Sequence, residues 1–270
     1  MDTEMGERVL VEGLKLAQFH WGERLVATYA LGSLAHGGFS PHVSDVDLAL
    51  ILDDPLDEGD AEGVDRLLNS MRAGGSPLAE RLSVFWGSMA TLSGATSRGR
   101  FPPLDLLDLK KFGRLLTGRD VRSRLPTPTL RELVVSGGGF ALKHLSTPEA
   151  TALLKNPAGL AAAGVKRLTK LVLYPARFLY TARTGEIGMN HKAAEHFSEV
   201  EAGPAAELAR KGLGWRFAPP LPGDRVVVEL LQKGVLPLYQ RFLDDYESRL
   251  RAYGELELAQ AYCEWRQRLL

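Results

Sequence analysis

The 270-residue sequence has a single cysteine, no net charge and no long apolar run. Cys263 alone cannot form a disulfide within the chain or build a thiolate-rich zinc site, which fits a reducing compartment. The 33 acidic and 33 basic side chains balance, so no overall field draws the protein onto nucleic acid or an anionic membrane. No segment approaches the ~20 apolar residues that a membrane-spanning helix needs, and Met1–Glu7 is acidic rather than basic. We therefore expect a soluble, cytoplasmic protein without a nucleic-acid or membrane partner.

Length and composition favour an ordinary globular protein of two domains. Apolar residues make up 45% and charged residues 24% of the chain, which argues against disordered or fibrous classes. Two prolines interrupt the segment Arg124–Thr129 between structured stretches, as in a linker. The sequence predicts a first domain over residues 1–125 and a second over 126–270.

The hydrophobic patterns predict a first domain of strands and helices, of the α+β class, and an almost wholly helical second domain. The expected strands cover 25–31, 45–52 and 82–86, and the expected helices of the first domain cover 7–24 and 61–72. The expected helices of the second domain cover 130–145, 158–184, 192–199, 205–211 and 226 to the end. The stretch Leu104–Leu116 fits either a short helix or a strand with a turn at Gly113. The run Gly137–Gly139 indicates a hinge rather than a phosphate-binding loop.

Two aspartates open the second expected strand. Residues i and i+2 of a strand point the same way, so Asp45 and Asp47 present both carboxylates to one side while Val46 and Leu48 face the core. Magnesium prefers a few carboxylate oxygens, with water and substrate phosphates completing its shell. The pair therefore predicts a Mg²⁺ site suited to phosphate chemistry.

A glycine and a serine end the preceding strand. Gly32 lets the chain approach a triphosphate closely, and Ser33 can offer its hydroxyl and its backbone N–H to phosphate oxygens. Alone, such a turn is common, and an Asp-x-Asp at a strand start is often a solvated edge or a helix cap. The two features on consecutive strands, in this order, favour a functional site.

Gly32-Ser33 followed after 12 residues by Asp45-Val46-Asp47 resembles the signature of the nucleotidyltransferase superfamily that includes DNA polymerase β. The resemblance implies an α+β fold, in which a polymerase β-like domain with a small mixed sheet and helices is followed by an all-helical bundle domain. It also implies transfer of a nucleoside monophosphate from a triphosphate, usually ATP, to an acceptor hydroxyl. Pyrophosphate is the leaving group of that reaction.

The helical half has a resemblance of its own. Leu171–Phe197 is similar to the C-terminal domain of the streptomycin/spectinomycin-type aminoglycoside adenylyltransferases, where an arginine and a lysine of this segment reach the ATP phosphates. Arg177 matches the arginine, whereas Asn190 stands at the lysine position and Lys192 follows two residues later. A solvated helix face is the alternative interpretation of Arg177 and Lys192.

This chain departs from the family's pattern at the third carboxylate. It usually lies on the strand after the intervening helix, where this chain has Ser83. Asp105 is the best substitute, with Asp108 and Glu80 behind it, and a surface residue or helix cap is the alternative for Asp105. General-base help normally contributes ~10²–10⁴-fold to a rate.

The stretch that would bind the acceptor also differs from that of the family. Acidic residues before the segment hold the cationic drug in the aminoglycoside enzymes, whereas Ala161–Lys170 here is basic and apolar. We therefore expect a neutral or anionic small-molecule acceptor. The sequence as a whole predicts a Mg²⁺-dependent nucleotidyltransferase that transfers AMP from ATP. The alternative is a nucleotide-binding or interaction protein that kept the fold and lost efficient catalysis.

Overall fold

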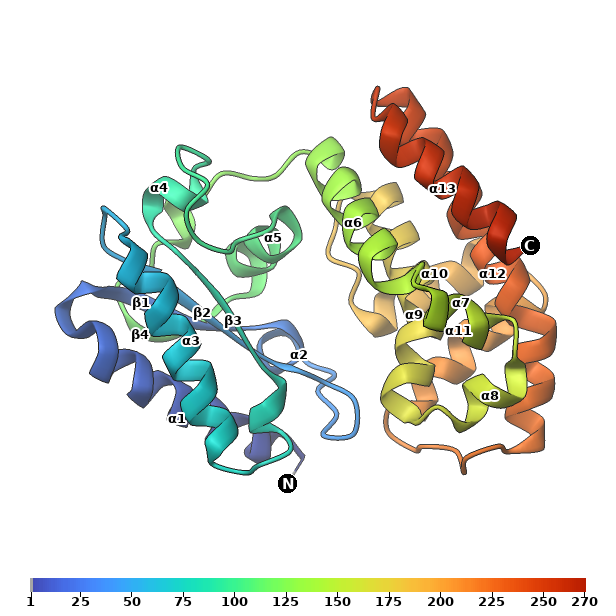
Figure 1. Cartoon of the computed structure of the whole chain (residues 1–270), viewed down its shortest axis with the longest axis horizontal. Helices are drawn as coiled ribbons and strands as arrows, with labels where there is room; N and C mark the ends of the chain where they lie inside the picture. The colour runs from blue at the N-terminus through green and yellow to red at the C-terminus, as the bar shows by residue number, and fades with distance from the viewer. Residues whose placement is uncertain (1) are drawn as a thin grey trace. The chain divides into compact units, whose positions relative to one another are not determined.

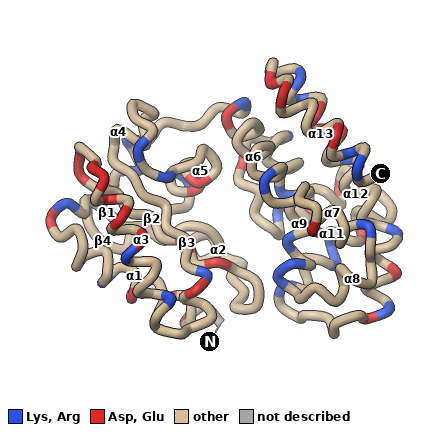
Figure 2. Tube along the Cα trace, in the orientation of Figure 1, with Lys and Arg blue, Asp and Glu red and all other residues tan. Residues whose placement is uncertain are grey.

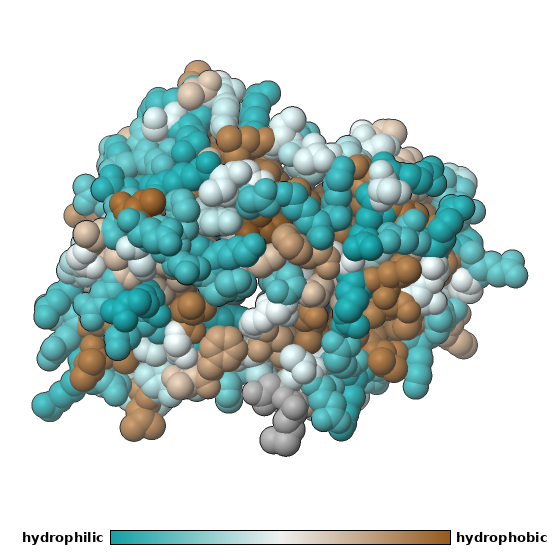
Figure 3. Space-filling model, turned by 180° about the vertical axis from the view of Figure 1, so that it is seen from behind, coloured by the Kyte–Doolittle hydropathy of each residue, from teal (hydrophilic) through white to brown (hydrophobic). Residues whose placement is uncertain are grey.

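The computed structural model describes residues 2–270 and divides into two compact units, Met1–Pro128 and Thr129–Leu270 (Figure 1). The division falls within the proline-containing segment in which the sequence analysis placed the linker. Acidic and basic positions are spread over helices of both units (Figure 2). None of the helices within residues 2–270 combines the length and the apolarity needed to cross a membrane. The face drawn in Figure 3 is mainly hydrophilic, with apolar residues in separate patches.

Within the described residues of the first unit, a four-stranded mixed sheet forms the centre (Figure 1). Its strands are β1 (Leu25–Leu31), β2 (Val46–Leu52), β3 (Leu82–Gly87) and β4 (Arg114–Gly118). They lie in the order β3-β2-β1-β4; β1 pairs antiparallel with β2 and β4, and β2 pairs parallel with β3. The register places Leu31 and Ser83 on either side of Asp47. The start of β2 is thus enclosed by the end of β1 and the start of β3.

Helices cover both faces of this sheet. They are α1 (Asp2–Trp21), α2 (Gly32–His36), α3 (Glu58–Ala73), α4 (Met89–Leu92) and α5 (Pro103–Phe112), with 3₁₀ turns η1 (Gly22–Arg24), η2 (Ala79–Arg81) and η3 (Arg122–Arg124). Because side chains alternate along a strand, β2 supplies two separate cores. Leu48 and Leu50 pack in the core with α1 and α3, whereas Ala49 and Ile51 pack in the core with α5. Asp47 has the same parity as Ala49, so its side chain belongs to the α5 face.

The ambiguous stretch Leu104–Leu116 contains both of the elements considered for it. α5 ends at Phe112, and β4 begins at Arg114. At Gly113, between them, a Cβ would come within 3.0 Å of the Leu109 side chain and closer still to the Leu109 carbonyl, so only glycine fits the tight exit from the helix. The stretch therefore contains a helix and then a strand, with a turn at Gly113 between them.

A buried carboxylate, paired with a partly exposed arginine, fixes α1 and η1 to the start of α3. The Asp60 carboxylate is 1% exposed and accepts hydrogen bonds of 2.9 Å from Trp21 Nε1 and from both terminal nitrogens of Arg24. Asp60 also completes a capping box with Asp57 at the N-terminus of α3. These bonds hold the helices against the sheet face opposite Asp47.

The second unit is helical throughout its regular elements. Its helices are α6 (Leu130–Leu145), α7 (Pro148–Leu154), α8 (Pro157–Ala162), α9 (Val165–Thr184), α10 (Asn190–Val200), α11 (Pro204–Trp215), α12 (Arg225–Ala252) and α13 (Leu256–Leu269). Two stretches predicted as single helices are broken in two. The breaks fall at Gly164, with φ +84°, and at Gly254, with φ +78°, a backbone conformation that favours glycine.

The prediction of a hinge at Gly137–Gly139 is wrong, because these residues lie inside α6. A Cβ on Gly137 would lie 3.3 Å from the Phe178 ring and from the Tyr246 hydroxyl, and the Tyr262 hydroxyl donates a 3.2 Å hydrogen bond to the Gly138 carbonyl. The glycines therefore allow close packing of α6 against the aromatic core of this unit.

Candidate functional site

Gly32 and Asp47 are in direct contact at the junction of β1 and α2. Gly32 has φ +61°, and a Cβ placed on it would collide with the Asp47 carboxylate. Glycine is thus required here both by the backbone conformation and by the close approach. The predicted glycine turn and one of the two predicted metal ligands lie together, and Ser33 follows as the second residue of α2.

A second carboxylate reaches the same glycine from the other side. Asp108, on α5, accepts a 2.7 Å hydrogen bond from the Gly32 backbone N–H, and its side chain is about 10% exposed. The His36 Nε2 lies 4.0 Å from the other oxygen of Asp108, and the His36 ring packs edge-on against Phe112. Gly32 is therefore in contact with one carboxylate from β2 and one from α5.

Asp45 directly precedes β2 and is exposed, whereas Asp47 is half-buried. Side chains alternate along the strand, so Val46 is completely buried and Asp45 is expected to point to the same side as Asp47. The loop before Asp45 is fixed by the Ser44 N–H, which donates to the Ser40 carbonyl at 2.9 Å. It is also held by Arg81, which donates to the Pro41 carbonyl at 2.5 Å.

Arg81 brings a positive charge to the acidic end of β2, and the sequence analysis did not single it out. Burial lowers the pKa of its guanidinium, and the nearby Asp45 carboxylate opposes that shift. The two charges are therefore close enough to interact. The available signal was the position of Arg81 immediately before the strand that pairs in parallel with β2.

The acids proposed as a third carboxylate lie in different surroundings. Ser83 is paired directly beside Asp47 on β3, so no acid occupies that register position. Asp105 is half-buried in the first turn of α5, and Glu80 is exposed in η2. Of the three acids, Asp108 is the one with a hydrogen bond to Gly32, although Asp105 ranked ahead of it in the sequence analysis. The role of Asp105 as a catalytic acid or base stays a prediction.

The predicted phosphate contacts of the second unit are on α9 and α10. Arg177, half-buried on α9, donates a 2.6 Å hydrogen bond from Nε to the Gly188 carbonyl, and its guanidinium lies 4.9 Å from the centre of the Tyr174 ring. Lys192 is exposed in the first turn of α10. Arg216 was not predicted; its burial, and after burial the positive charge of Arg177, lowers the pKa of its guanidinium.

Asp45 and Asp47 have the chemistry of a Mg²⁺ ligand pair. Carboxylate oxygens at an accessible strand start are donors that this ion accepts together with water and phosphate oxygens. Among the side chains of residues 3–270, no group of three or more His, Cys, Asp or Glu is arranged to hold a metal ion. The residues fit a two-carboxylate site that a substrate phosphate would complete.

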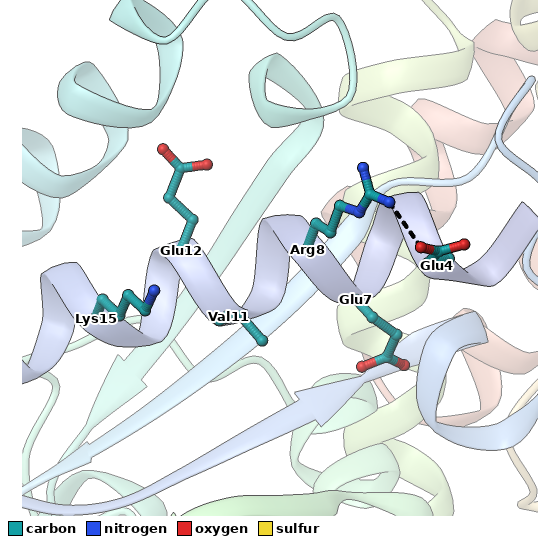
Figure 4. A pocket seen from close by; sticks show the side chains of 6 residues that line it. All are labelled: Glu4, Glu7, Arg8, Val11, Glu12 and Lys15. Atoms are coloured by element: carbon teal, nitrogen blue, oxygen red, sulfur yellow. Dashed lines mark hydrogen bonds and ion pairs between the residues drawn. The ribbon is translucent and has the colours of Figure 1, made fainter. Parts of the chain in front are cut away.

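A hollow along α1 lies apart from these residues (Figure 4). It is lined by Glu4, Glu7, Arg8, Val11, Glu12 and Lys15. Arg8 pairs with Glu4 at 2.6 Å one turn away, and Glu7 pairs with Arg114 of β4 at 2.6 Å. Because every lining residue comes from one solvated helix face, the hollow contributes nothing to the candidate site.

The comparison with solved structures finds proteins of similar fold, whereas the two sequence comparisons find no match. No protein-family model matches the chain, and no curated protein sequence matches it. The fold is similar to the crystal structure of spectinomycin adenyltransferase AAD(9) from Enterococcus faecialis with ATP and spectinomycin, with a TM-score of 0.57 at 13% sequence identity. The match covers 84% of this chain and 99% of that protein.

This likeness extends over both units and confirms the predicted fold class. The chain has the fold of that adenyltransferase, an α+β unit followed in the chain by a helical unit. The likeness concerns the fold, and the roles of the residues in Leu171–Phe197 stay predictions.

Proposed function

We propose that this protein is a Mg²⁺-dependent nucleotidyltransferase that transfers AMP from ATP to a hydroxyl of a small-molecule acceptor. An oxygen–phosphorus bond forms between the acceptor and the α-phosphate, the bond to the β-phosphate breaks, and pyrophosphate leaves. The adenylyltransferase fold supports the reaction class. The contact of Gly32 with the Asp47 carboxylate, beside Asp108, is the observation that carries the assignment.

Asp45 and Asp47 would hold the metal ion, and Gly32 and Ser33 would hold the triphosphate. The bound ion supplies charge stabilisation to the reacting phosphate and lowers the pKa of the attacking hydroxyl. The absence of a side chain at Gly32 lets the chain pass directly beside the Asp47 carboxylate, so the turn that carries Ser33 lies next to a proposed metal ligand. Ser33 offers a hydroxyl that donates to one of the phosphate oxygens.

The hydroxyl proton of the acceptor has two candidate bases on α5. Asp108 is within hydrogen-bond distance of Gly32, and Asp105 is one helical turn nearer the N-terminus on the same side of α5. Because Asp108 contacts the phosphate-binding glycine directly, we favour Asp108. In the second unit, Arg177 and Lys192 would add positive charge for the phosphates.

Pyrophosphate release tests this function directly. The protein is incubated with ATP, Mg²⁺ and a library of neutral and anionic hydroxyl compounds. Asp45→Ala and Asp47→Ala are expected to lower the rate by about 10²-fold or more, since loss of a metal ligand removes several kcal/mol of transition-state stabilisation. Both variants should keep the wild-type melting temperature. Full activity in Asp45→Ala would overturn the metal assignment.

The pairing of Ser83 with Asp47 favours a second candidate, a nucleotide-binding or interaction protein with weakened catalysis. An acid at that register position would sit beside the metal ligands, and this chain has a hydroxyl there instead. Calorimetry with ATP and Mg²⁺ separates the two functions. Binding of ATP without pyrophosphate release across the whole acceptor library would support the second candidate.

A further inference from the structure

Arg81 and Asp45 occupy corresponding positions before two paired strands of the first unit. β2 and β3 lie side by side as a parallel pair (Figure 1), and Val46 of β2 is paired with Leu82 of β3. Asp45 directly precedes Val46, and Arg81 directly precedes Leu82. Neighbouring strands of a sheet lie about 4.8 Å apart, so the two residues are brought next to each other where β2 and β3 begin. The fold therefore places a cation beside a proposed metal ligand.

The same ladder indicates which face of the sheet the two side chains share. Residues paired directly across neighbouring strands point to the same face, and the face alternates along each strand. Asp47 is paired with Ser83, two residues after Asp45 and Arg81. We therefore expect Arg81 on the side of Asp45 and Asp47. Burial lowers the pKa of the Arg81 guanidinium and the Asp45 carboxylate opposes that shift, which agrees with this placement.

The turn before Asp45 is closed by hydrogen bonds of its own. The N–H groups of Val43 and Ser44 both donate to the Ser40 carbonyl, at 3.2 and 2.9 Å. The Ser40 N–H donates to the Ser44 hydroxyl at 3.0 Å. Ser40 is completely buried, and Ser44 is 6% exposed. Because the turn ends directly before Asp45, its orientation sets the direction from which Asp45 enters β2.

Arg81 connects this turn to the neighbouring strand. Its Nη2 donates a 2.5 Å hydrogen bond to the carbonyl of Pro41, which lies 40 residues earlier in the chain. Arg81 is half-buried at the end of η2, immediately before β3. A hydrogen bond from a charged donor is stronger than one between neutral groups, and partial exclusion of water strengthens it further. The guanidinium thus fixes the turn to the strand beside β2.

We propose that Arg81 is a positioning residue of the metal site. Its guanidinium anchors the turn through Pro41 and attracts the Asp45 carboxylate, so Asp45 is held on the side of Asp47 before a cation arrives. An exposed aspartate after an unanchored turn would lose more conformational entropy when it binds a metal ion. The inference rests on the proposed function, because it takes Asp45 and Asp47 as the Mg²⁺ ligands.

The charge of Arg81 also has an effect of the opposite sign. A positive charge near a cation site repels the cation, so its removal would by itself strengthen Mg²⁺ binding. Loss of the anchor would weaken Mg²⁺ binding, because Asp45 would then be ordered only when the ion binds. The charge of Arg81 is partly offset by the Asp45 carboxylate, so we expect the loss of the anchor to dominate. The direction of the change therefore separates the two roles.

Hydrogen–deuterium exchange followed by NMR tests the anchor without an assay of activity. Arg81→Met keeps an apolar stem but has no donor, so the Val43 and Ser44 amides should exchange about tenfold faster or more than in wild type. Arg81→Lys keeps a charged donor and should give intermediate rates. Arg72→Gln, at an exposed position near the end of α3, is the matched control and should exchange as wild type does. Unchanged exchange in Arg81→Met would overturn the proposal.

The Mg²⁺ dependence of pyrophosphate release tests the link to the metal site. Arg81→Met should raise the Mg²⁺ concentration that gives half the maximal rate about tenfold, whereas the KM for ATP at saturating Mg²⁺ should stay within about twofold of wild type. Arg81→Lys should recover part of this effect, and Arg72→Gln should match wild type. A purely structural role would lower the rate equally at every Mg²⁺ concentration. An unchanged or lowered Mg²⁺ requirement in Arg81→Met, or an equal rise in Arg72→Gln, would overturn the proposal.

Failure of the proposed function is distinguishable from failure of this inference. If no acceptor supports pyrophosphate release by the wild type, Mn²⁺ binding to the full chain, measured by electron paramagnetic resonance, replaces the Mg²⁺ dependence. Weaker Mn²⁺ binding in Arg81→Met than in wild type would support the role of Arg81 in a protein without transferase activity. Equal or tighter binding in that variant, or no binding of Mn²⁺ to the wild type, would overturn it.

Discussion

Asp108 on α5 accepts a 2.7 Å hydrogen bond from the backbone N–H of Gly32, which lies 76 residues earlier in the chain. Gly32 also touches the Asp47 carboxylate, so one glycine connects the end of β1, the start of β2 and α5. A change at either carboxylate or at the glycine is therefore expected to disturb the other two.

Gly32→Ala should abolish most transferase activity. The new Cβ would collide with the Asp47 carboxylate, and the left-handed backbone adds roughly 1–2 kcal/mol of strain for a residue with a Cβ. Gly37→Ala is the matched control, because Gly37 also has a positive φ of +91° but open space around its Cβ position. Pyrophosphate release and melting temperature are measured for both. Equal activity in the two variants would contradict the role of the close approach.

Asp108→Asn and Asp105→Asn decide which acid of α5 serves the reaction. If Asp108 accepts the acceptor proton, Asp108→Asn lowers kcat by about 10²–10⁴-fold, whereas Asp105→Asn leaves it nearly unchanged. The pH profile is the second measurement, because loss of a general base removes the acidic limb of the profile. The reverse pattern of rates would assign the role to Asp105, as the sequence analysis ranked it.

Tyr29 is expected to make the first unit less stable at alkaline pH. Its hydroxyl accepts a 2.8 Å hydrogen bond from the Val121 N–H and donates a 3.0 Å hydrogen bond to Asp120, and burial raises its pKa to about 12. A pKa above the unfolded value of ~10 means that this contribution is complete below pH ~10 and is lost as the pH rises toward 12.

Denaturant unfolding of wild type and Tyr29→Phe across that pH range measures the effect. At neutral pH the variant should be about 1 kcal/mol less stable, from the lost hydrogen bonds. The difference in unfolding free energy should shrink above pH ~10, since only the wild type has Tyr29 to ionise on unfolding. A difference that stays constant up to pH 12 would show that the Tyr29 pKa is not raised.

Asp60→Ala should destabilise the first unit by about 1–3 kcal/mol, because it leaves the buried Trp21 Nε1 without its acceptor and removes the partner of Arg24. Asp65→Ala, at an exposed position of the same helix, is the control and should stay near wild type. Thermal unfolding measures both.

The Asp60 carboxyl also makes the stability of the first unit depend on pH in the acid range. Burial raises the Asp60 pKa, but the hydrogen bonds from Arg24, Asp57 and Trp21 outweigh burial and lower it overall. Stability from Asp60 is therefore present above the unfolded pKa of ~3.9 and is lost as the pH falls below it. Asp60→Ala should remove that part of the acid sensitivity.

The sequence predicted β1, β2 and β3 because these three strands have clear local signals, whereas β4 lies in the stretch that fitted a helix or a strand. β1 spans the predicted residues 25–31, and the apolar run after Asp47 forms β2 with alternate residues in two different cores. The Gly32-Ser33 turn and the Asp45-Val46-Asp47 motif are also short, and each is recognised from consecutive residues. Such short-range signals can be read from the sequence alone, and the predicted fold class depended on them.

The local sequence does not contain the information needed to choose between Asp105 and Asp108. Both acids lie in a stretch whose periodicity fits a helix or a strand, and the orientation of α5 on the sheet decides which one approaches Gly32. Arg81 and Arg216 were missed for the same reason, because their electrostatic interactions with Asp45 and Arg177 depend on tertiary packing. In the second unit, apolar periodicity continues across Gly164, so the break between α8 and α9 was not visible.

The parallel ladder between β2 and β3 makes the site adaptable by a single substitution. Main-chain bonds hold position 83 beside Asp47 whatever side chain it carries. Ser83→Asp would therefore place a third acidic group beside the proposed metal ligands without rearranging the sheet. A rise in turnover in that variant would mean that a missing carboxylate at position 83 limits the natural enzyme, whereas a fall would mean that a carboxylate is not needed there.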